Sequence, residues 1–432
     1  MTEKLYKKSN LRIAMISEHG DPLAPLGGQQ SGGQNVYVYE LARALSRVGV
    51  KVDVYTRWDN RKSASKVRFA ERAKVIRLKV GPRQFISKDK FGPLMPEFVE
   101  KFLECTRISR TKYDLIHGHY YFSGWAGLQL KNILKVPLVE TYHSLGLLKK
   151  KAMKELDTSP TERTEIERLI MNKADKIIAT SPQEKISMIT EYSPKKDNIA
   201  VVPCGTNLLR FNPIDQVVAR KKLGIPLDKK VVVFASKMER RKGALTVVSV
   251  AKEIKNRWPA VYKNLQVHMF SGDPRKERTK EKQEQNFRDV LKAAIKKVGV
   301  NGKIKLSHGI DQEKLHYYYC AADVVIMPSY YEPFGMVAIE AMACGTPVVA
   351  SNVGGLKWTI EDGITGFHAE PKNAVKFAKC IVKIVSDPEL KERLGKNGVI
   401  RVRQNFSWNI IAEKILDIYK ELIEENNQEL KK

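Results

Sequence analysis

The sequence predicts an α/β protein with two domains, each built on a parallel β-sheet with helices on both faces. Three observations lead to this prediction. The chain has 432 residues, more than one compact core of ordinary size accommodates. Short apolar runs alternate with segments long enough to form helices, and this alternation is typical of parallel sheets. The pattern restarts near Lys230, so a second α/β domain is the simplest interpretation.

The N-terminal half predicts a strand, a glycine-rich loop, a helix and a second strand. The apolar run at residues 11–17 ends in the glycine-rich loop. Apolar residues at helical spacing then lead to a glycine that caps the helix and to alternating valines: Tyr37, Leu41, Leu45, Val48, Gly49, Val50, Val52 and Val54. Further strands are expected at residues 115–116, 137–139, 177–179 and 199–202.

The C-terminal half predicts a second sheet and a final helix. Strands are expected at residues 231–235, 265–270, 304–306, 324–327 and 348–350. Proline, glycine and asparagine in the segment 202–213 indicate a linker between the domains. Residues 408–425 carry apolar side chains at helical intervals, so they form an amphipathic helix that must dock on one of the two domains.

Composition narrows the classes of protein that are possible. The formal charge of +28 suits nucleic acid, an anionic membrane surface or phosphorylated small molecules, and it also suits a generally basic protein. No apolar run reaches the length of a membrane span, and the N-terminal residues MTEKLYKKSN lack the apolar part of a signal peptide. A cytoplasmic location is therefore expected.

The spacing of the five cysteines predicts neither a disulfide framework nor a metal site. Cys105, Cys204, Cys320, Cys344 and Cys380 are scattered, with no C-x-x-C pair and no histidine at metal-ligand spacing. They are expected to be buried or incidental thiols in a reducing compartment.

The glycine-rich loop, residues 27–35 (GGQQSGGQN), lies between the first strand and the first helix. Glycines allow backbone N–H groups to approach a phosphate closely, and the N-terminus of a helix favours negative charge. The loop matches neither G-x-G-x-x-G nor a Walker loop, so an anion site and a plain flexible turn both remain possible, with the anion site favoured.

Two glutamates lie eight residues apart in the segment EPFGMVAIEAMACGTPVVAS. Glu332 is expected in a loop before a helix, and Glu340 about two turns inside that helix. Carboxylates accept hydrogen bonds from vicinal hydroxyls, so the pair suits a ligand with two diol groups, while N–H groups at the helix start suit its phosphates.

This segment resembles the E-x7-E motif of retaining glycosyltransferases with the GT-B fold, family 4 (group 1). The segment SGGQNVYVYELARAL is similar to the donor-phosphate loop of the branch that contains sucrose-phosphate synthases and inositol-phosphate glycosyltransferases. The resemblance covers nearly the whole chain. It implies two Rossmann-like domains that face a central cleft: an acceptor-binding domain over residues 1–207, a nucleotide-sugar-binding domain over 208–405, and a helix over 406–432 that crosses back to the first domain.

The resemblance also implies donor-binding residues. Glu332 would hold hydroxyls of the sugar and Glu340 those of the ribose. Lys237 and Lys242 would neutralise the departing diphosphate, although Lys237 stands where the family commonly has arginine, so the bidentate fork is lost. Backbone amides at five positions would face the sugar and diphosphate: Gly32, Gly33, Phe334, Gly335 and Met336.

Three histidines lie near predicted strand ends. His143 matches the family histidine beside the reacting sugar, and with Lys237, Lys242 and Glu332 it completes the implied catalytic set; a structural role is the alternative. His117 and His119 alternate on a strand end without a third ligand nearby, so no metal site is predicted.

The acceptor side carries four positions that match residues gripping a phosphate in this branch. They are Lys88, Tyr120, Ser144 and Arg163, whose cations and hydroxyls are chemically suitable. Lys88 and Arg163 are alternatively ordinary surface residues of a basic protein.

The resemblance implies metal-independent transfer of a hexose, with UDP-glucose as the representative donor, to a phosphorylated sugar or inositol. No cofactor is implied beyond the nucleotide sugar. Because no carboxylate is offered as a nucleophile, retention implies front-face substitution rather than double displacement. Two alternatives remain: a lipid-linked or polymeric acceptor at a membrane surface, to which the chain would bind peripherally, and, more remotely, nucleic-acid binding. The oligomeric state is left open.

Overall fold

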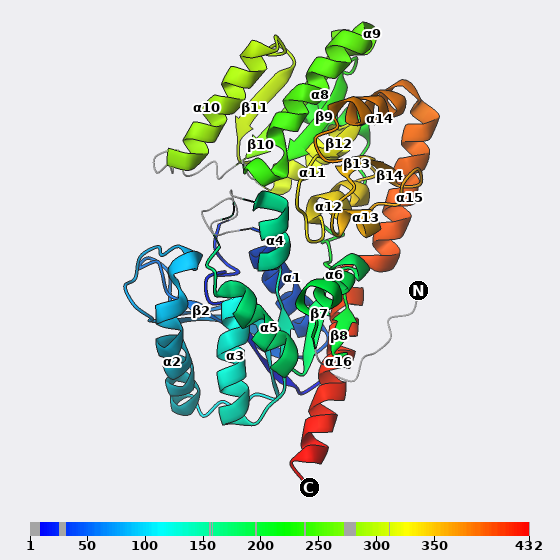
Figure 1. Cartoon of the computed structure of the whole chain (residues 1–432). Helices are drawn as coiled ribbons and strands as arrows, with labels where there is room; N and C mark the ends of the chain where they lie inside the picture. The colour runs from blue at the N-terminus through cyan, green and yellow to red at the C-terminus, as the bar shows by residue number, and fades with distance from the viewer. Residues whose placement is uncertain are drawn as a thin grey trace. The chain divides into compact units, whose positions relative to one another are not determined.

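The computed structural model describes residues 9–25, 32–154, 157, 159–194, 197–236, 239–271, 282–310 and 312–431 (Figure 1). Within these residues the chain divides into two compact units. The first unit contains the described residues up to Gly205 and the C-terminal residues from Trp408 onward, and the second unit is Thr206–Ser407. Each unit contains one β-sheet.

The sheet of the first unit has eight strands among the described residues, in the order β3-β4-β2-β1-β5-β6-β7-β8. Neighbouring strands are parallel except for β3 and β4. Chain order reverses between β1 and β5, which makes their carboxyl ends a topological switch point. The bounds are β1 Arg12–Ile16, β2 Lys51–Arg57, β3 Lys66–Ala70, β4 Ala73–Leu78, β5 Leu115–His119, β6 Leu138–Thr141, β7 Lys176–Ala179 and β8 Ile199–Val201.

Helices of the first unit cover this sheet (Figure 1). Local sequence fixes several of their ends: α6 begins after Ser181, whose hydroxyl accepts a hydrogen bond from the Glu184 N–H, and Pro182 occupies the first helical position. The bounds are α1 Gly33–Arg47, α2 Met95–Ile108, α3 Tyr121–Leu134, α4 Gly146–Met153, α5 Arg163–Lys173, α6 Pro182–Tyr192 and α16 Trp408–Glu429.

The last helix, α16, packs on the first unit although it follows the whole second unit in sequence. The Tyr419 hydroxyl and His117 Nδ1 are hydrogen-bonded at 2.6 Å, and both residues are fully buried. The Trp408 indole packs edge-on against the Tyr37 ring with centroids 5.3 Å apart. The apolar stripe of α16 is thus covered by the elements of the first unit.

The sheet of the second unit has six parallel strands in its described part, in the order β11-β10-β9-β12-β13-β14. Its strands are β9 Lys230–Ala235, β10 Leu265–Ser271, β11 Ile304–His308, β12 Val324–Met327, β13 Val348–Ser351 and β14 Gly366–Ala369. Its helices are α7 Gln216–Leu223, α8 Ala244–Arg257, α9 Pro259–Asn264, α10 Lys282–Lys297, α11 Gln312–Ala321, α12 Met336–Ala343, α13 Leu356–Thr359, α14 Ala374–Ser386 and α15 Pro388–Asn405.

The predicted fold class, two Rossmann-like parallel-sheet domains, is confirmed by this topology. Three strands were not predicted: β3, β4 and β14. Of these, β3 is an edge strand that is partly exposed, so its apolar signal is weak, and β4 lies between β3 and β2. None of the helices in the described parts of the chain is both long and apolar enough to cross a membrane.

One prediction about the cysteines is wrong. All five thiols are free and all but Cys105 are buried, but a histidine does lie at metal-ligand spacing from a cysteine. His316 precedes Cys320 by four residues, and both lie on α11, so their side chains share one face of that helix. A third group, Cys344, joins them through tertiary packing that sequence spacing does not reveal.

Candidate active site

Polar and aromatic residues gather where three neighbouring strands of the first sheet end. Strands β1, β5 and β6 lie side by side and run parallel, so the residues that follow them meet at one edge. Ligands of open α/β sheets bind at this edge. The residues at these strand ends are Glu18, His19, His119, Tyr120, His143 and Ser144.

The Tyr120 ring lies beside both predicted acceptor-binding cations. Lys88 Nζ is 5.1 Å from the ring centroid, and the Arg163 guanidinium carbon is 4.9 Å from it. Arg163 also donates a hydrogen bond to the Ser144 carbonyl oxygen. The structure therefore brings together all four residues that the sequence singled out for the acceptor.

Arg163 is not a surface residue. It is 1% exposed, and its Nε lies 2.7 Å from Glu167 Oε1, which is itself fully buried. Glu167 also accepts hydrogen bonds from the Gly146 N–H and the Tyr192 hydroxyl. A buried guanidinium with this many partners is held rigidly, so its alternative interpretation as a solvated cation is wrong.

Glu18 and His19, which lie just after the end of β1, were not predicted from the sequence. His19 Nδ1 lies 2.6 Å from Glu18 Oε1, and the His19 ring packs edge-on against Tyr120 with centroids 4.7 Å apart. The Ser123 hydroxyl donates a hydrogen bond to the other Glu18 oxygen. Their position after the first strand of a parallel sheet was the available signal, but no motif pointed to them.

Three histidines form a contiguous group at the same edge. His119 Nδ1 lies 3.1 Å from His143 Nε2, and the rings of His117 and His119 lie 4.2 Å apart. Burial lowers the pKa of His143 to about 3, with a further contribution from the nearby His19. Burial also lowers the pKa of His117 to about 3. The imidazoles are therefore neutral at physiological pH and act as hydrogen-bonding groups.

Two of the predicted site residues have a strained backbone. Tyr120 has φ of 87° and His143 has φ of 58°, both in the region that favours glycine. Such conformations cost about 1–3 kcal/mol each and persist where the surroundings over-determine them, which occurs often at active sites. The strain supports functional interpretations of both residues.

The first helix starts close to this edge. Gly32 is the N-cap residue of α1, which begins at Gly33, and the Gly32 N–H donates to Asn35 Oδ1 at 2.9 Å. Gln34 Nε2 donates to the His119 carbonyl at 3.1 Å. These hydrogen bonds fix the first turn of α1 beside the end of β5.

In the second unit, Lys242 and Glu332 come from loops after the adjacent strands β9 and β12. Lys242 Nζ lies 2.5 Å from Glu332 Oε2, and the two side chains are 14% and 11% exposed. Burial lowers the pKa of the Lys242 ammonium, and the Glu332 carboxylate opposes that shift. The structure thus pairs two of the predicted donor-binding residues directly.

Glu340 lies on α12, surrounded by apolar residues of that helix. It is 9% exposed, and its Oε2 accepts a hydrogen bond from the Tyr319 hydroxyl at 3.2 Å. Burial raises the pKa of Glu340 to about 7. Because α12 begins at Met336, Glu340 lies about one turn inside the helix, and the expected two turns are wrong.

The segment between the glutamates turns sharply into α12. Gly335 has φ of 101°, so the backbone conformation favours glycine, and a Cβ there would lie 2.5 Å from Leu356 Cδ2, which would have to move. Phe334 is buried, and its ring packs against Trp358. Phe334, Gly335 and Met336 therefore have backbones held in place by their neighbours.

Two predicted elements lie outside the described residues. These are Lys237 and residues 27–31 of the glycine-rich loop. Their predicted roles stay predictions.

Two family models match this chain, each mainly within one of its two units. A family model for glycosyl transferases group 1 matches residues 215–401, and one for glycosyltransferase family 4 matches residues 31–210. The D-inositol 3-phosphate glycosyltransferase of Corynebacterium efficiens is 33% identical over 415 residues, covering 95% of each chain. The corresponding protein of Corynebacterium aurimucosum is 34% identical over 413 residues, covering 95% of this chain and 96% of the relative.

Among solved structures, sucrose-phosphate synthase from Thermosynechococcus elongatus is similar over 96% of this chain and 99% of its own, with 36% identity and a TM-score of 0.87. The branch indicated by the sequence motifs is therefore confirmed. The chain belongs to the family 4 (group 1) glycosyltransferases and has their GT-B fold.

Proposed function

We propose that this glycosyltransferase moves a hexose from a nucleotide diphosphate sugar to a small phosphorylated acceptor, an inositol phosphate or a sugar phosphate. The observation that carries the proposal is the pair of cations, Lys88 and Arg163, on the ring of Tyr120 at the carboxyl edge of the first sheet. Two cations beside one aromatic ring suit a phosphate group, which accepts several charge-assisted hydrogen bonds.

The names of the relatives support this acceptor class. The two Corynebacterium proteins are described as acting on D-inositol 3-phosphate, and the solved relative is a sucrose-phosphate synthase. Both names include a phosphorylated small molecule. Lys88, Tyr120, Ser144 and Arg163 would form its binding site.

The second unit would hold the donor. Glu332 and Glu340 each offer a carboxylate to vicinal hydroxyls, and Lys242 offers a cation to the diphosphate. Gly335 and Met336 lie where the N-terminus of α12 favours phosphate charge. UDP-glucose is the representative donor in this proposal.

Transfer would proceed with retention, by front-face substitution. Both motif glutamates already have partners, Lys242 for Glu332 and Tyr319 for Glu340. Glu18, at the acceptor edge, is fully buried and bonded to His19 and Ser123. These contacts disfavour a carboxylate nucleophile and therefore a double displacement.

Charge on the leaving diphosphate would be stabilised by lysine side chains. Lys242 and Lys237, together with the amides of Gly32 and Gly33, would supply this stabilisation, so the proposed chemistry needs no metal ion at the diphosphate. Neutral His143 would position the reacting sugar as a hydrogen-bonding group. A cytoplasmic location is part of the proposal, because five free thiols suit a reducing compartment.

The acceptor proposal is tested by replacing Lys88. Loss of a charge-assisted hydrogen bond costs about 1.5–3 kcal/mol, so Lys88→Met is expected to raise KM for a phosphorylated acceptor by roughly 10-fold to 100-fold. KM for the donor should stay the same. Lys90→Met is the matched control, because Lys90 is exposed and lies on the same 3-10 turn, Lys88–Lys90.

Initial rates with inositol phosphate and with inositol, and with fructose 6-phosphate and with fructose, provide the comparison. The proposal fails if Lys88→Met behaves like Lys90→Met, or if phosphorylated and unphosphorylated acceptors react equally well. Turnover with a lipid-linked acceptor alone would instead favour a membrane-surface enzyme.

A further inference from the structure

A cluster of two thiols and an imidazole lies in the second unit. His316 and Cys320 occupy successive turns of α11, and Cys344 is the C-cap residue of α12. One potential ligand atom from each residue lies within 4.8 Å of the other two. Both thiols are 5% exposed.

The spacing of these atoms suits a single tetrahedral ion. In a zinc shell with bonds of 2.0–2.3 Å, neighbouring ligand atoms lie roughly 3.3–3.8 Å apart. The backbone carbonyl oxygen of Asn212 accepts hydrogen bonds from His316 Nε2 at 2.7 Å and from Cys320 Sγ at 3.5 Å, and a bound zinc ion would replace these two protons. A water molecule would take the remaining corner. Small movements of the three side chains would complete the shell.

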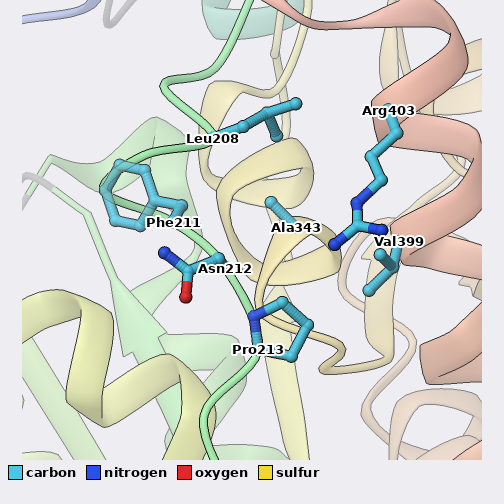
Figure 2. A pocket seen from close by; sticks show the side chains of 7 residues that line it. All are labelled: Leu208, Phe211, Asn212, Pro213, Ala343, Val399 and Arg403. Atoms are coloured by element: carbon cyan, nitrogen blue, oxygen red, sulfur yellow. The ribbon is translucent and has the colours of Figure 1, made fainter. Parts of the chain in front are cut away.

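A small pocket opens next to the cluster. Its volume is about 40 Å³, enough for a few water molecules. Figure 2 shows Asn212 and Ala343 among its lining residues, together with Arg403 from α15. Asn212 contributes the carbonyl oxygen described above, and Ala343 directly precedes Cys344.

The ligand types select the metal. Thiolates and imidazole bind zinc tightly, whereas magnesium and calcium prefer oxygen ligands. We propose that His316, Cys320 and Cys344 form a zinc site that joins α11 to α12. The ion takes no part in the transfer reaction, since none of the residues proposed for catalysis is a ligand.

This joint flanks Glu340, the proposed ribose-binding carboxylate. The Cys344 N–H donates to the Glu340 carbonyl at 3.2 Å. Tyr319, which directly precedes Cys320, donates its hydroxyl to Glu340 Oε2. Zinc is therefore expected to strengthen donor binding, because it would hold in place both residues that are hydrogen-bonded to Glu340. This effect on donor binding rests on the proposed function.

The test begins with the full-length, fully reduced protein after removal of bound metal. Zinc chloride titrated by calorimetry should give one ion per chain. Cobalt(II) should give the thiolate charge-transfer bands and the intense visible bands of a tetrahedral site. Zinc should also protect two thiols per chain from alkylation, which requires no variant. None of these three measurements depends on transferase activity.

Variants then identify the ligands. Cys320→Ser and Cys344→Ser should each weaken zinc binding by more than about 100-fold, since even the loss of an outer-shell partner costs about 10-fold to 100-fold. His316→Gln should alter the cobalt spectrum. Cys380→Ser is the matched control, because Cys380 is 6% exposed, lies in the same unit and is outside the cluster. Its zinc binding should be unchanged.

Several results would overturn the site. These are less than stoichiometric zinc on reduced protein, equal protection of all thiols, a spectrum unaffected by His316→Gln, or recovery of Cys320 and Cys344 as a disulfide under reducing conditions. If zinc binds but the affinity for nucleoside diphosphate is unchanged, the site stands and its link to Glu340 fails. If no nucleoside diphosphate binds with or without zinc, the proposed function fails and the site stands.

Discussion

Because Lys242 and Glu332 form an ion pair, neutralising Glu332 should have opposite effects on two quantities: the affinity for nucleoside diphosphate and the rate of sugar transfer. In the proposed function, the Lys242 ammonium contacts the donor diphosphate while Glu332 binds hydroxyls of the sugar. The Glu332 carboxylate also repels the diphosphate. Glu332→Gln is therefore expected to strengthen binding of the nucleoside diphosphate, which lacks the sugar, and to slow sugar transfer.

The structure sets the size of this effect. A phosphate oxygen at about 2.8 Å from Lys242 Nζ lies at most about 5 Å from the Glu332 carboxylate, because the Nζ–Oε2 distance is 2.5 Å. At an effective dielectric constant of about 20, two unit charges at that separation repel by about 3 kcal/mol. The side chains are only 14% and 11% exposed, so solvent screens this repulsion only in part, and at least about 1 kcal/mol, or about fivefold in Kd, is expected to remain.

Calorimetric titration of UDP, ADP and GDP into the wild type, Glu332→Gln and Lys242→Met measures the effect. For the nucleotide that binds, Glu332→Gln should lower Kd about fivefold and Lys242→Met should raise it about tenfold. The rate of sugar transfer should fall in both variants. The reasoning is refuted if Glu332→Gln weakens nucleotide binding as much as Lys242→Met does.

Three more substitutions test other parts of the account. Arg163→Met leaves Glu167 buried without its cation, so the free energy of unfolding measured by urea titration should fall by roughly 3–5 kcal/mol. A loss below about 1 kcal/mol would contradict the buried ion pair. Tyr419→Phe removes a hydrogen bond to the buried His117, so the free energy of unfolding should fall by about 1–3 kcal/mol. An unchanged urea midpoint would show that this hydrogen bond contributes little to the docking of α16. Burial and the like charges of Glu18 and Glu167 raise the pKa of Glu140 well above its usual value, so the folded state keeps a proton that the unfolded state releases, and stability falls as pH rises. Glu140→Gln should flatten the decline in unfolding free energy as the pH rises above about 4.5, the ordinary pKa of glutamate, and an equal slope in both proteins would contradict the raised pKa.

Most of the fold could be predicted because parallel strands buried on both faces appear as short apolar runs. The runs at β5, β6, β9 and β12 are examples, with most of their residues fully buried. Edge strand β3 alternates exposed and half-buried residues and gave no such run. The internal strand β4 was also missed, because charged residues interrupt its apolar run (AKVIRL). An uninterrupted apolar run therefore decided which strands the sequence revealed.

The candidate site was predictable where a motif carries it. Glu332 and Glu340 were found from their spacing and their neighbours, and Lys242 from its family position. His19 and Glu18 belong to no motif that was used, and only the meeting of β1 with β5 brings them beside Tyr120.

Features that the sequence did not reveal depend on packing between residues from different segments. The burial of Arg163 depends on Glu167 one turn later and on the Ser144 carbonyl from another loop. The thiol cluster likewise depends on contact between α11 and α12, which the separation of Cys320 and Cys344 in sequence does not indicate. Such groups are defined by side-chain contacts and not by periodicity.

The central claim is sugar transfer to a phosphorylated acceptor, and release of nucleoside diphosphate tests it most directly. UDP-, ADP- and GDP-glucose would each be incubated with the protein, alone and with inositol phosphate, fructose 6-phosphate or glucose 6-phosphate. The account predicts that release from one donor rises sharply when one of these acceptors is added. Failure of every donor to bind, or donor binding without turnover on any phosphorylated acceptor, would contradict it.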